Sequence, residues 1–127
     1  PDLLRGRWDK QVWNVPFNGL SVVHGGMTTD VSLASAEREA EVWALMREVQ
    51  AAAAAYGFEI PDAFVTDQVE RTRPMGPYKP STMLDYLAGR PLEVEPIWGE
   101  PLRRARAKGV ATPRLEALYG ALKRLSA

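Results

Sequence analysis

Three polar side chains that could act on a ligand follow one another at four-residue steps near the start of the chain: Lys10, Asn14 and Asn18. If this stretch is helical, the three lie on one face, because residues four apart overlie each other. The residues around them are largely apolar, and burying polar groups there without partners costs several kilocalories per mole. We therefore expect this face either to join an internal polar network or to bind a ligand.

Ser81 and Glu93 are two further candidates. Ser81 begins a predicted helix beside Lys79 and Thr82, where free backbone N–H groups, the helix dipole and a hydroxyl together favour a carboxylate or a phosphate. Glu93 is a carboxylate in an otherwise apolar segment. Each residue also has an ordinary explanation, because serines cap helices, acidic residues favour first turns and lysines extend to solvent. The case for a site thus depends on the set rather than on one residue.

The composition argues against several other kinds of chemistry. The chain has 127 residues, with 16 basic and 16 acidic side chains and no cysteine, which rules out disulfides and cysteine nucleophiles. This charge balance gives no reason to expect nucleic acid or an anionic membrane as a partner. No signal peptide or membrane-spanning run is visible. His24 is the single histidine and is expected to contact carbonyls at a helix end. With one histidine and no cysteine, a metal site would need several converging carboxylates, and since no such spacing appears we predict no metal site. The known glycine-rich nucleotide-binding motifs do not occur.

The elements that must position these residues are all predicted to be helices, forming one all-α domain over residues 1–127. Hydrophobic periodicity, caps and stop glycines predict a compact bundle of five or six helices. Their expected ranges are 4–23, from a Ser35 cap to Gly57, a shorter helix from Pro61, 81–88, 93–108, and a last helix that Thr112 caps. Pro16 lies inside the first helix and cannot donate a backbone hydrogen bond, so we expect a bend there.

Four sequence segments carry a resemblance to a known family. They are K-x-x-x-N-x-x-x-N at 10–18, K-P-S-T-M-L-D at 79–85, G-R-P-L-E-V-E-P-I-W-G at 89–99 and G-V-A-T-P-R-L-E-A-L-Y at 109–119. In this order and spacing they resemble the C-terminal helical domain of the ketopantoate reductase (2-dehydropantoate 2-reductase) family. The resemblance implies the all-α fold of 6-phosphogluconate dehydrogenase C-terminal domains. It also implies that an N-terminal Rossmann domain, absent from this chain, binds most of the NADPH.

The resemblance assigns roles to the five candidate residues. Lys10 falls at the catalytic lysine, which polarises the substrate ketone and donates or relays a proton. Asn14 and Asn18 match two asparagines that position the lysine and the substrate. Ser81 matches the serine that holds the substrate carboxylate, and Glu93 matches the glutamate that accepts a hydrogen bond from the substrate hydroxyl. These types suit the reaction, because hydride delivery to a ketone builds negative charge on oxygen and requires a cationic acid there.

The expected protein is therefore a cytoplasmic, NADPH-dependent reductase that converts ketopantoate to pantoate in pantothenate and coenzyme A biosynthesis. The chain opens on Pro1, and as a fragment it is expected to be inactive alone. Two alternatives stay open: a sibling reductase for another 2-oxo acid, and a stand-alone helical interaction or dimerisation module. For a homodimer, the alanine-rich segment 51–55 and the last helix are the expected contact surfaces.

Overall fold

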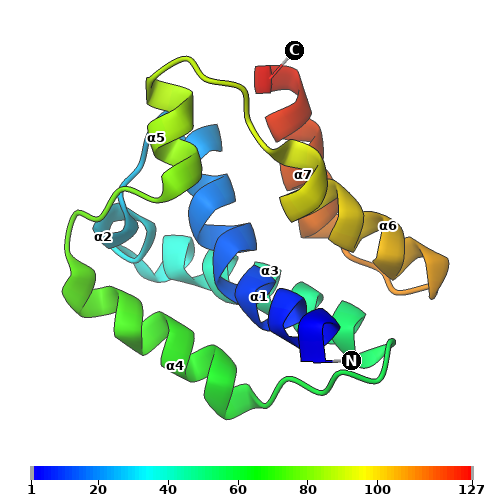
Figure 1. Ribbon diagram of the computed structural model, residues 1–127. Coiled ribbons are helices and arrows are strands. Elements are labelled where there is room, and N and C mark those ends of the chain that lie inside the picture. Colours follow the sequence, from blue (N-terminus) through cyan, green and yellow to red (C-terminus); the bar gives the residue numbers. More distant parts are fainter. Residues whose placement is uncertain (1, 127) are drawn as a thin grey trace.

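Helix α1, residues Asp2–Val23, lies at the centre of the molecule, and the other elements pack around it. In the computed structural model, residues 2–126 are described, with side chains from residue 7 onward. Figure 1 shows α1 crossed by α3 and flanked by α2, α4 and α5 on one side and by α6 and α7 on the other. Pro16 lies inside α1 without ending it, and a bend at this point stays a prediction. Gly25 and Gly26, both at positive φ, follow its end as expected.

The described residues form seven α-helices and no strand, which confirms the predicted all-α bundle. After α1 come α2 (Thr29–Ser32), α3 (Ala36–Ala54), α4 (Asp62–Thr72), the short 3₁₀ helix η1 (Arg73–Met75) and α5 (Ser81–Leu87). The chain ends with the π-helix η2 (Glu95–Gly99), α6 (Glu100–Ala107) and α7 (Pro113–Ser126). The sequence patterns missed α2, because four residues are too few to show a helical period. Among the described residues, no helix is both long enough and apolar enough to cross a membrane.

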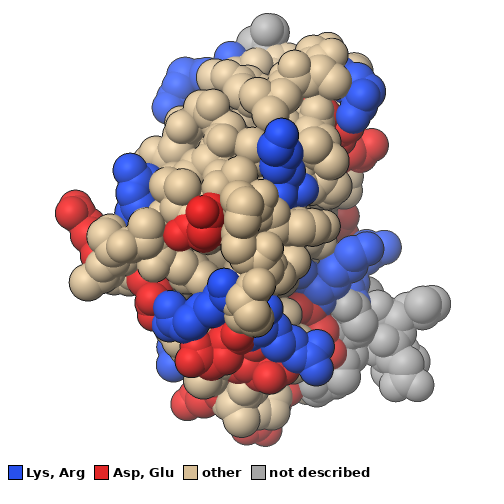
Figure 2. All heavy atoms as spheres, turned by 90° about the vertical axis from the view of Figure 1, so that its left-hand side faces the viewer, with Lys and Arg blue, Asp and Glu red and all other residues tan. Residues whose placement is uncertain are grey.

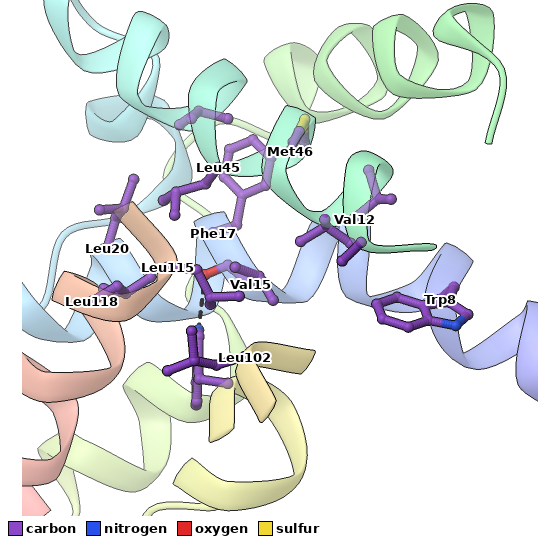
Figure 3. Packing of buried hydrophobic residues seen from close by; sticks show 14 of the residues in the cluster. Trp8, Val12, Val15, Phe17, Leu20, Leu45, Met46, Leu102, Leu115 and Leu118 are labelled. Atoms are coloured by element: carbon purple, nitrogen blue, oxygen red, sulfur yellow. Dashed lines mark hydrogen bonds between the residues drawn. The ribbon is translucent and has the colours of Figure 1, made fainter. Parts of the chain in front are cut away.

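The core forms where α1, α3 and α7 meet, and Figure 3 shows ten of its side chains by name. α3 contributes the predicted apolar stripe, of which Val42, Leu45, Met46, Val49 and Ala53 are buried. Its start is confirmed as well, because Ser35 Oγ accepts a hydrogen bond from the Arg38 backbone N–H at 3.1 Å. Only part of the alanine-rich segment packs inward: Ala52 and Ala53 are buried, whereas Ala51 and Ala54 are exposed.

The predicted helix at 93–108 is interrupted by a π-turn. The Glu100 N–H donates to the Glu95 carbonyl, five residues back, and η2 therefore precedes the regular helix α6. Pro101 has no N–H to give to the carbonyl of Ile97, which favours the wider turn at this point. Glu93 lies immediately before Val94, the first helical residue of this segment.

The start of α7 corrects a second expectation. Thr112 precedes the helix, but its buried Oγ1 has no hydrogen-bond partner among the described residues, so it does not cap α7 through its side chain. The Glu48 carboxylate of α3 does so instead, accepting from the backbone N–H groups of Arg114 at 3.1 Å and Leu115 at 2.8 Å. A carboxylate at a helix N-terminus satisfies free N–H groups and favours the helix dipole. The cap thus comes from a residue distant in sequence.

Candidate functional site

Lys10 lies on the exposed side of α1, and its ammonium forms no ion pair or hydrogen bond with the described residues. The other polar groups of α1 differ in this respect. Gln11 is buried and donates to the Pro96 carbonyl at 3.1 Å, and the Trp13 indole N–H donates to Thr72 Oγ1 at 2.9 Å. A free, exposed cation beside neighbours that are fixed by hydrogen bonds is available to a ligand.

Asn14 and Asn18 form a hydrogen-bonded pair that reaches across to α5. Asn18 Nδ2 donates to Asn14 Oδ1 at 3.1 Å, and Asn18 Oδ1 accepts from the Thr82 backbone N–H at 2.8 Å. Asn18 is 2% exposed, whereas Asn14 is half-buried. At the C-terminal end of this face, Asn18 therefore belongs to an internal polar network. Toward the N-terminal end, Asn14 and Lys10 stay accessible.

Ser81 is the first residue of α5, and its exposed hydroxyl makes no hydrogen bond with the described residues. Pro80 occupies the N-cap position without a side-chain cap, and Asn18 supplies the acceptor for the next N–H group. The ordinary explanation, that Ser81 caps its own helix, is therefore wrong. Since the helix is capped by another residue, the hydroxyl is free to donate to a ligand.

The loop that leads to Ser81 is fixed to the body of the protein. The Thr29 backbone N–H donates to the Tyr78 carbonyl and its hydroxyl donates to the Gly76 carbonyl, both at 3.0 Å. The Tyr78 ring also meets the Trp13 ring edge-on, with 6.4 Å between centroids. These contacts hold the loop before α5, in addition to the bond that Asn18 makes at its start.

Glu93 is exposed and has no partner among the described residues, but the helical segment that follows it is firmly attached to α1. The fully buried indole of Trp98 donates to the Val15 carbonyl at 3.0 Å, the dashed line in Figure 3. Gly19 makes room for this contact, because an added Cβ would lie 2.8 Å from Trp98 Nε1 and 2.6 Å from Leu118 Cδ2.

An exposed set of charges fastens the outer side of the same segment. Glu95 accepts from Arg103 at 2.6 Å and from the Tyr119 hydroxyl at 2.8 Å, with Lys123 at 3.5 Å. The hydrogen bonds from Arg103 and Tyr119 lower the pKa of the Glu95 carboxyl below its ordinary range. The same carboxylate raises the pKa of the Arg103 guanidinium. These groups join η2 to α6 and α7 and leave Glu93 unpaired.

All five predicted residues thus lie on α1 or on segments that pack against it. It joins Asn14, Asn18 and the start of α5 directly, whereas Lys10, Ser81 and Glu93 keep free polar groups. Sequence reasoning missed the Thr82 backbone N–H and the anchoring roles of Gln11 and Trp98. Backbone donors carry no sequence signal, and nothing in the local pattern distinguishes these two anchors from other core residues.

Several other charged side chains on the surface form ion pairs, and those that the structure describes give no sign of a second site. The His24 side chain lies 3.6 Å from Glu41, so the predicted contact with helix-end carbonyls is not the one observed. In the part of the chain that is described, no three acidic or histidine side chains cluster closely enough to hold a metal ion. Figure 2 shows acidic and basic side chains intermixed over the lower part of one face, where α4 lies, with ion pairs such as Arg73–Glu39 at 2.8 Å.

Comparison with known proteins assigns this helical domain to a family. Residues 2–126 match the family model described as ketopantoate reductase PanE/ApbA C terminal. The chain belongs to this family, and the predicted resemblance is confirmed.

The relatives extend the match to both sequence and structure. A 2-dehydropantoate 2-reductase from a Nostoc species is 46% identical over 122 residues, covering 96% of this chain and 38% of the relative. The crystal structure of 2-dehydropantoate 2-reductase from Methylococcus capsulatus is 42% identical, with a TM-score of 0.91, over 97% of this chain and 39% of that one. The one from Geobacter metallireducens matches at 42% identity and a TM-score of 0.91, over 96% of this chain and 41% of that one. This chain therefore spans about two fifths of their length.

Proposed function

We propose that this chain is the substrate-side domain of a cytoplasmic, NADPH-dependent 2-dehydropantoate 2-reductase, which acts in pantothenate and coenzyme A biosynthesis. The observation that carries the proposal is the contrast within the site. Lys10, Ser81 and Glu93 keep unpaired polar groups, while the polar groups that hold their segments in place are hydrogen-bonded. The matched relatives named as 2-dehydropantoate 2-reductases support the substrate class.

The groups on this chain fit the substrate rather than the dinucleotide. The described residues form no strand and carry no glycine-rich turn between a strand and a helix, which is the element that holds pyrophosphate in Rossmann domains. When bound, NADPH would supply the hydride, and we propose that another domain holds most of it. This agrees with the expectation that the isolated chain neither binds NADPH well nor turns over substrate.

The proposed roles follow from the charge that develops on the substrate. As the ketone carbon is reduced, its oxygen gains negative charge, and the Lys10 ammonium stabilises that charge and donates a proton to form the alcohol. Ser81 donates a hydrogen bond to the carboxylate next to the ketone. Glu93 accepts from the substrate hydroxyl, so substrates that lack this hydroxyl leave a carboxylate unpaired and are selected against.

Replacing the lysine tests the proposal in the natural full-length protein. In Lys10→Ala we expect kcat for ketopantoate to fall by about 10²–10⁴-fold, the range for a lost general acid, with a smaller change in KM. NADPH oxidation measured by absorbance provides both constants. Lys108→Ala is the matched control, because that lysine is also exposed but belongs to none of the proposed site residues, and its ammonium lies 5.1 Å from the centroid of the Tyr56 ring. An unchanged kcat in Lys10→Ala would reject the catalytic role.

Substrate comparison separates the proposal from its alternatives. Ketopantoate should have a much higher kcat/KM than pyruvate, because pyruvate lacks the hydroxyl that Glu93 binds. Equal values would favour a sibling reductase for another 2-oxo acid. A natural reading frame with no nucleotide-binding domain before Pro1 would favour a stand-alone helical module instead.

A homodimer is a separate proposal, for which a Staphylococcus aureus ketopantoate reductase described as dimeric offers support at 25% identity and a TM-score of 0.83. Since Ala52 and Ala53 are used in the core, the exposed end of α7, where Leu125 is 44% exposed, is the better contact surface. If this surface joins two copies, Leu125→Glu should shift the sedimentation coefficient of the full-length protein from dimer to monomer.

A further inference from the structure

The hydrogen bonds of Asn18 fix which way two carboxamides point. Asn18 lies between the Thr82 backbone N–H, 2.8 Å from its Oδ1, and the Asn14 side chain, 3.1 Å from its Nδ2. A backbone N–H only donates, so the atom of Asn18 that faces it must be the oxygen. The other end of Asn18 is then an NH₂ group, which also only donates, so Asn14 must turn its oxygen toward Asn18. The network determines both orientations without reference to how amide atoms are assigned.

The NH₂ group of Asn14 forms no hydrogen bond with the described residues. Its carboxamide oxygen already accepts from Asn18, so the free end of the side chain donates and does not accept. Lys10 lies one helical turn before it, about 6 Å along the axis of α1, and its ammonium also only donates. The accessible end of this face therefore presents two donors, one charged and one neutral.

Two donors side by side select an oxygen that accepts hydrogen bonds. A ketone oxygen that gains negative charge, or the carboxylate beside it, is such an acceptor, and a substrate hydroxyl acting as a donor is not. The opposite orientation of Asn14 would present its oxygen to the Lys10 ammonium. That contact would engage the cation and remove the neutral donor.

We infer that Asn18 is a positioning residue: through the Thr82 N–H it turns Asn14 so that Asn14 donates to an acceptor oxygen of the 2-oxo acid alongside Lys10. This differs from a direct contact between Asn18 and substrate, which its 2% exposure makes unsuitable. The inference depends on the proposed function for the identity of the ligand, and on the hydrogen bonds alone for the orientation of Asn14.

Asn18→Asp in the full-length protein reverses the orientation with almost no change in shape. The aspartate still accepts from the Thr82 N–H, but it cannot donate to Asn14. Asn14 must then turn its NH₂ group toward residue 18 and present its oxygen to the ligand. We expect kcat/KM for ketopantoate to fall about 10–100-fold, the cost of replacing a donor by an acceptor against a charged oxygen. Wild-type values within twofold would overturn the inference.

Two substitutions of Asn14 keep the test decisive if a buried aspartate at residue 18 prevents folding. Asn14→Ala removes the donor, and Asn14→Asp replaces it with an acceptor while still accepting from Asn18. If polarity matters, kcat/KM must fall in the order wild type, Asn14→Ala, Asn14→Asp. A role limited to packing would make alanine the more harmful change, because aspartate keeps the shape and the bond to Asn18, and that order would overturn the inference.

Amide exchange separates failure of this inference from failure of the proposed function. In the wild type and in Asn18→Asp, the Thr82 amide proton should exchange much more slowly than that of Ser81, and the Asn14 side-chain amide resonance should move between the two proteins. Equal exchange of the Thr82 and Ser81 amides would reject the network itself. If these results hold but the wild type reduces no 2-oxo acid, the proposed function is wrong and the orientation stands.

Discussion

Two junctions hold the site-bearing segments against α1, and they differ in what makes them stable. At the α1–α5 junction, the small polar side chain of Asn18 contacts the Thr82 N–H behind Ser81. At the α1–η2 junction, the large buried indole of Trp98 packs against Gly19 and donates to the Val15 carbonyl. This junction holds the segment that follows Glu93 in the chain. Gln11 adds a hydrogen bond to the Pro96 carbonyl there, and Glu95 joins the outer side to α6 and α7.

The difference shows how one bundle meets two requirements. Burial of a tryptophan contributes mainly through removed apolar surface, which is large and not directional. A buried carboxamide contributes less net free energy, but it leaves a costly unpaired group whenever its geometry changes. The α1–η2 junction is therefore built for stability, and the α1–α5 junction for orientation of the groups beside Ser81.

The largest effect should come from Trp98→Ala. Truncation of a buried tryptophan costs about 3–5 kcal/mol through lost burial and a cavity, and Trp98 is fully buried. Thermal unfolding followed by circular dichroism should show a strongly lowered Tm. Trp98→Phe keeps much of the packing but loses the bond to Val15, so it should be clearly milder. Equal Tm values for these two variants would show that the hydrogen bond, rather than burial, dominates this junction.

An intermediate effect should come from Asn18→Leu. This change leaves the Thr82 N–H without its acceptor in a buried position, which costs about 1–3 kcal/mol. Urea unfolding monitored by fluorescence provides the free energy of unfolding.

Gln11→Leu is the matched change at the other junction. Gln11 Oε1 is buried and has no partner among the described residues, so leucine removes an unsatisfied atom. The Pro96 carbonyl that loses its donor belongs to an exposed residue, where water can replace it. We therefore expect a change below about 1 kcal/mol. A Gln11→Leu loss as large as that of Asn18→Leu would contradict the contrast between the junctions.

The smallest effect should come from Glu95→Gln, because exposed ion pairs contribute little and are screened by salt. The pKa of Glu95 is lowered in the folded protein, so its carboxylate stabilises the fold above the ordinary glutamate pKa of about 4.3. That contribution is lost as the pH falls through the lowered value. The difference in Tm between wild type and Glu95→Gln should therefore be small at pH 7, shrink in high salt and vanish in acid. A difference that grows with acidification would refute this sign.

Local patterns were sufficient for most of the helices. The Ser35 cap, the apolar stripe of α3 and the stop glycines after α1 and α3 all lie where they were predicted, because these signals act within a few residues. The errors occurred where a distant group intervened. Thr112 does not cap α7 because the Glu48 carboxylate occupies its N–H groups. The π-turn before α6 is different, because Pro101 in the same segment already lacks the N–H that the Ile97 carbonyl would accept.

The sequence by itself determined the helical class, the family and the five polar residues that are proposed to act on substrate. Periodicity, caps and motif spacing are properties of residues that are close in the chain, and they can be read without coordinates. Only the tertiary structure decided which of the five are free and which are engaged. Asn14 and Asn18 look equivalent at their four-residue spacing. In the structure, Asn18 is buried and accepts from the backbone N–H of Thr82, 64 positions further along the chain. Through its other end, Asn18 then orients Asn14. Hydrogen bonding between distant segments depends on how helices pack, and that is set by the whole core.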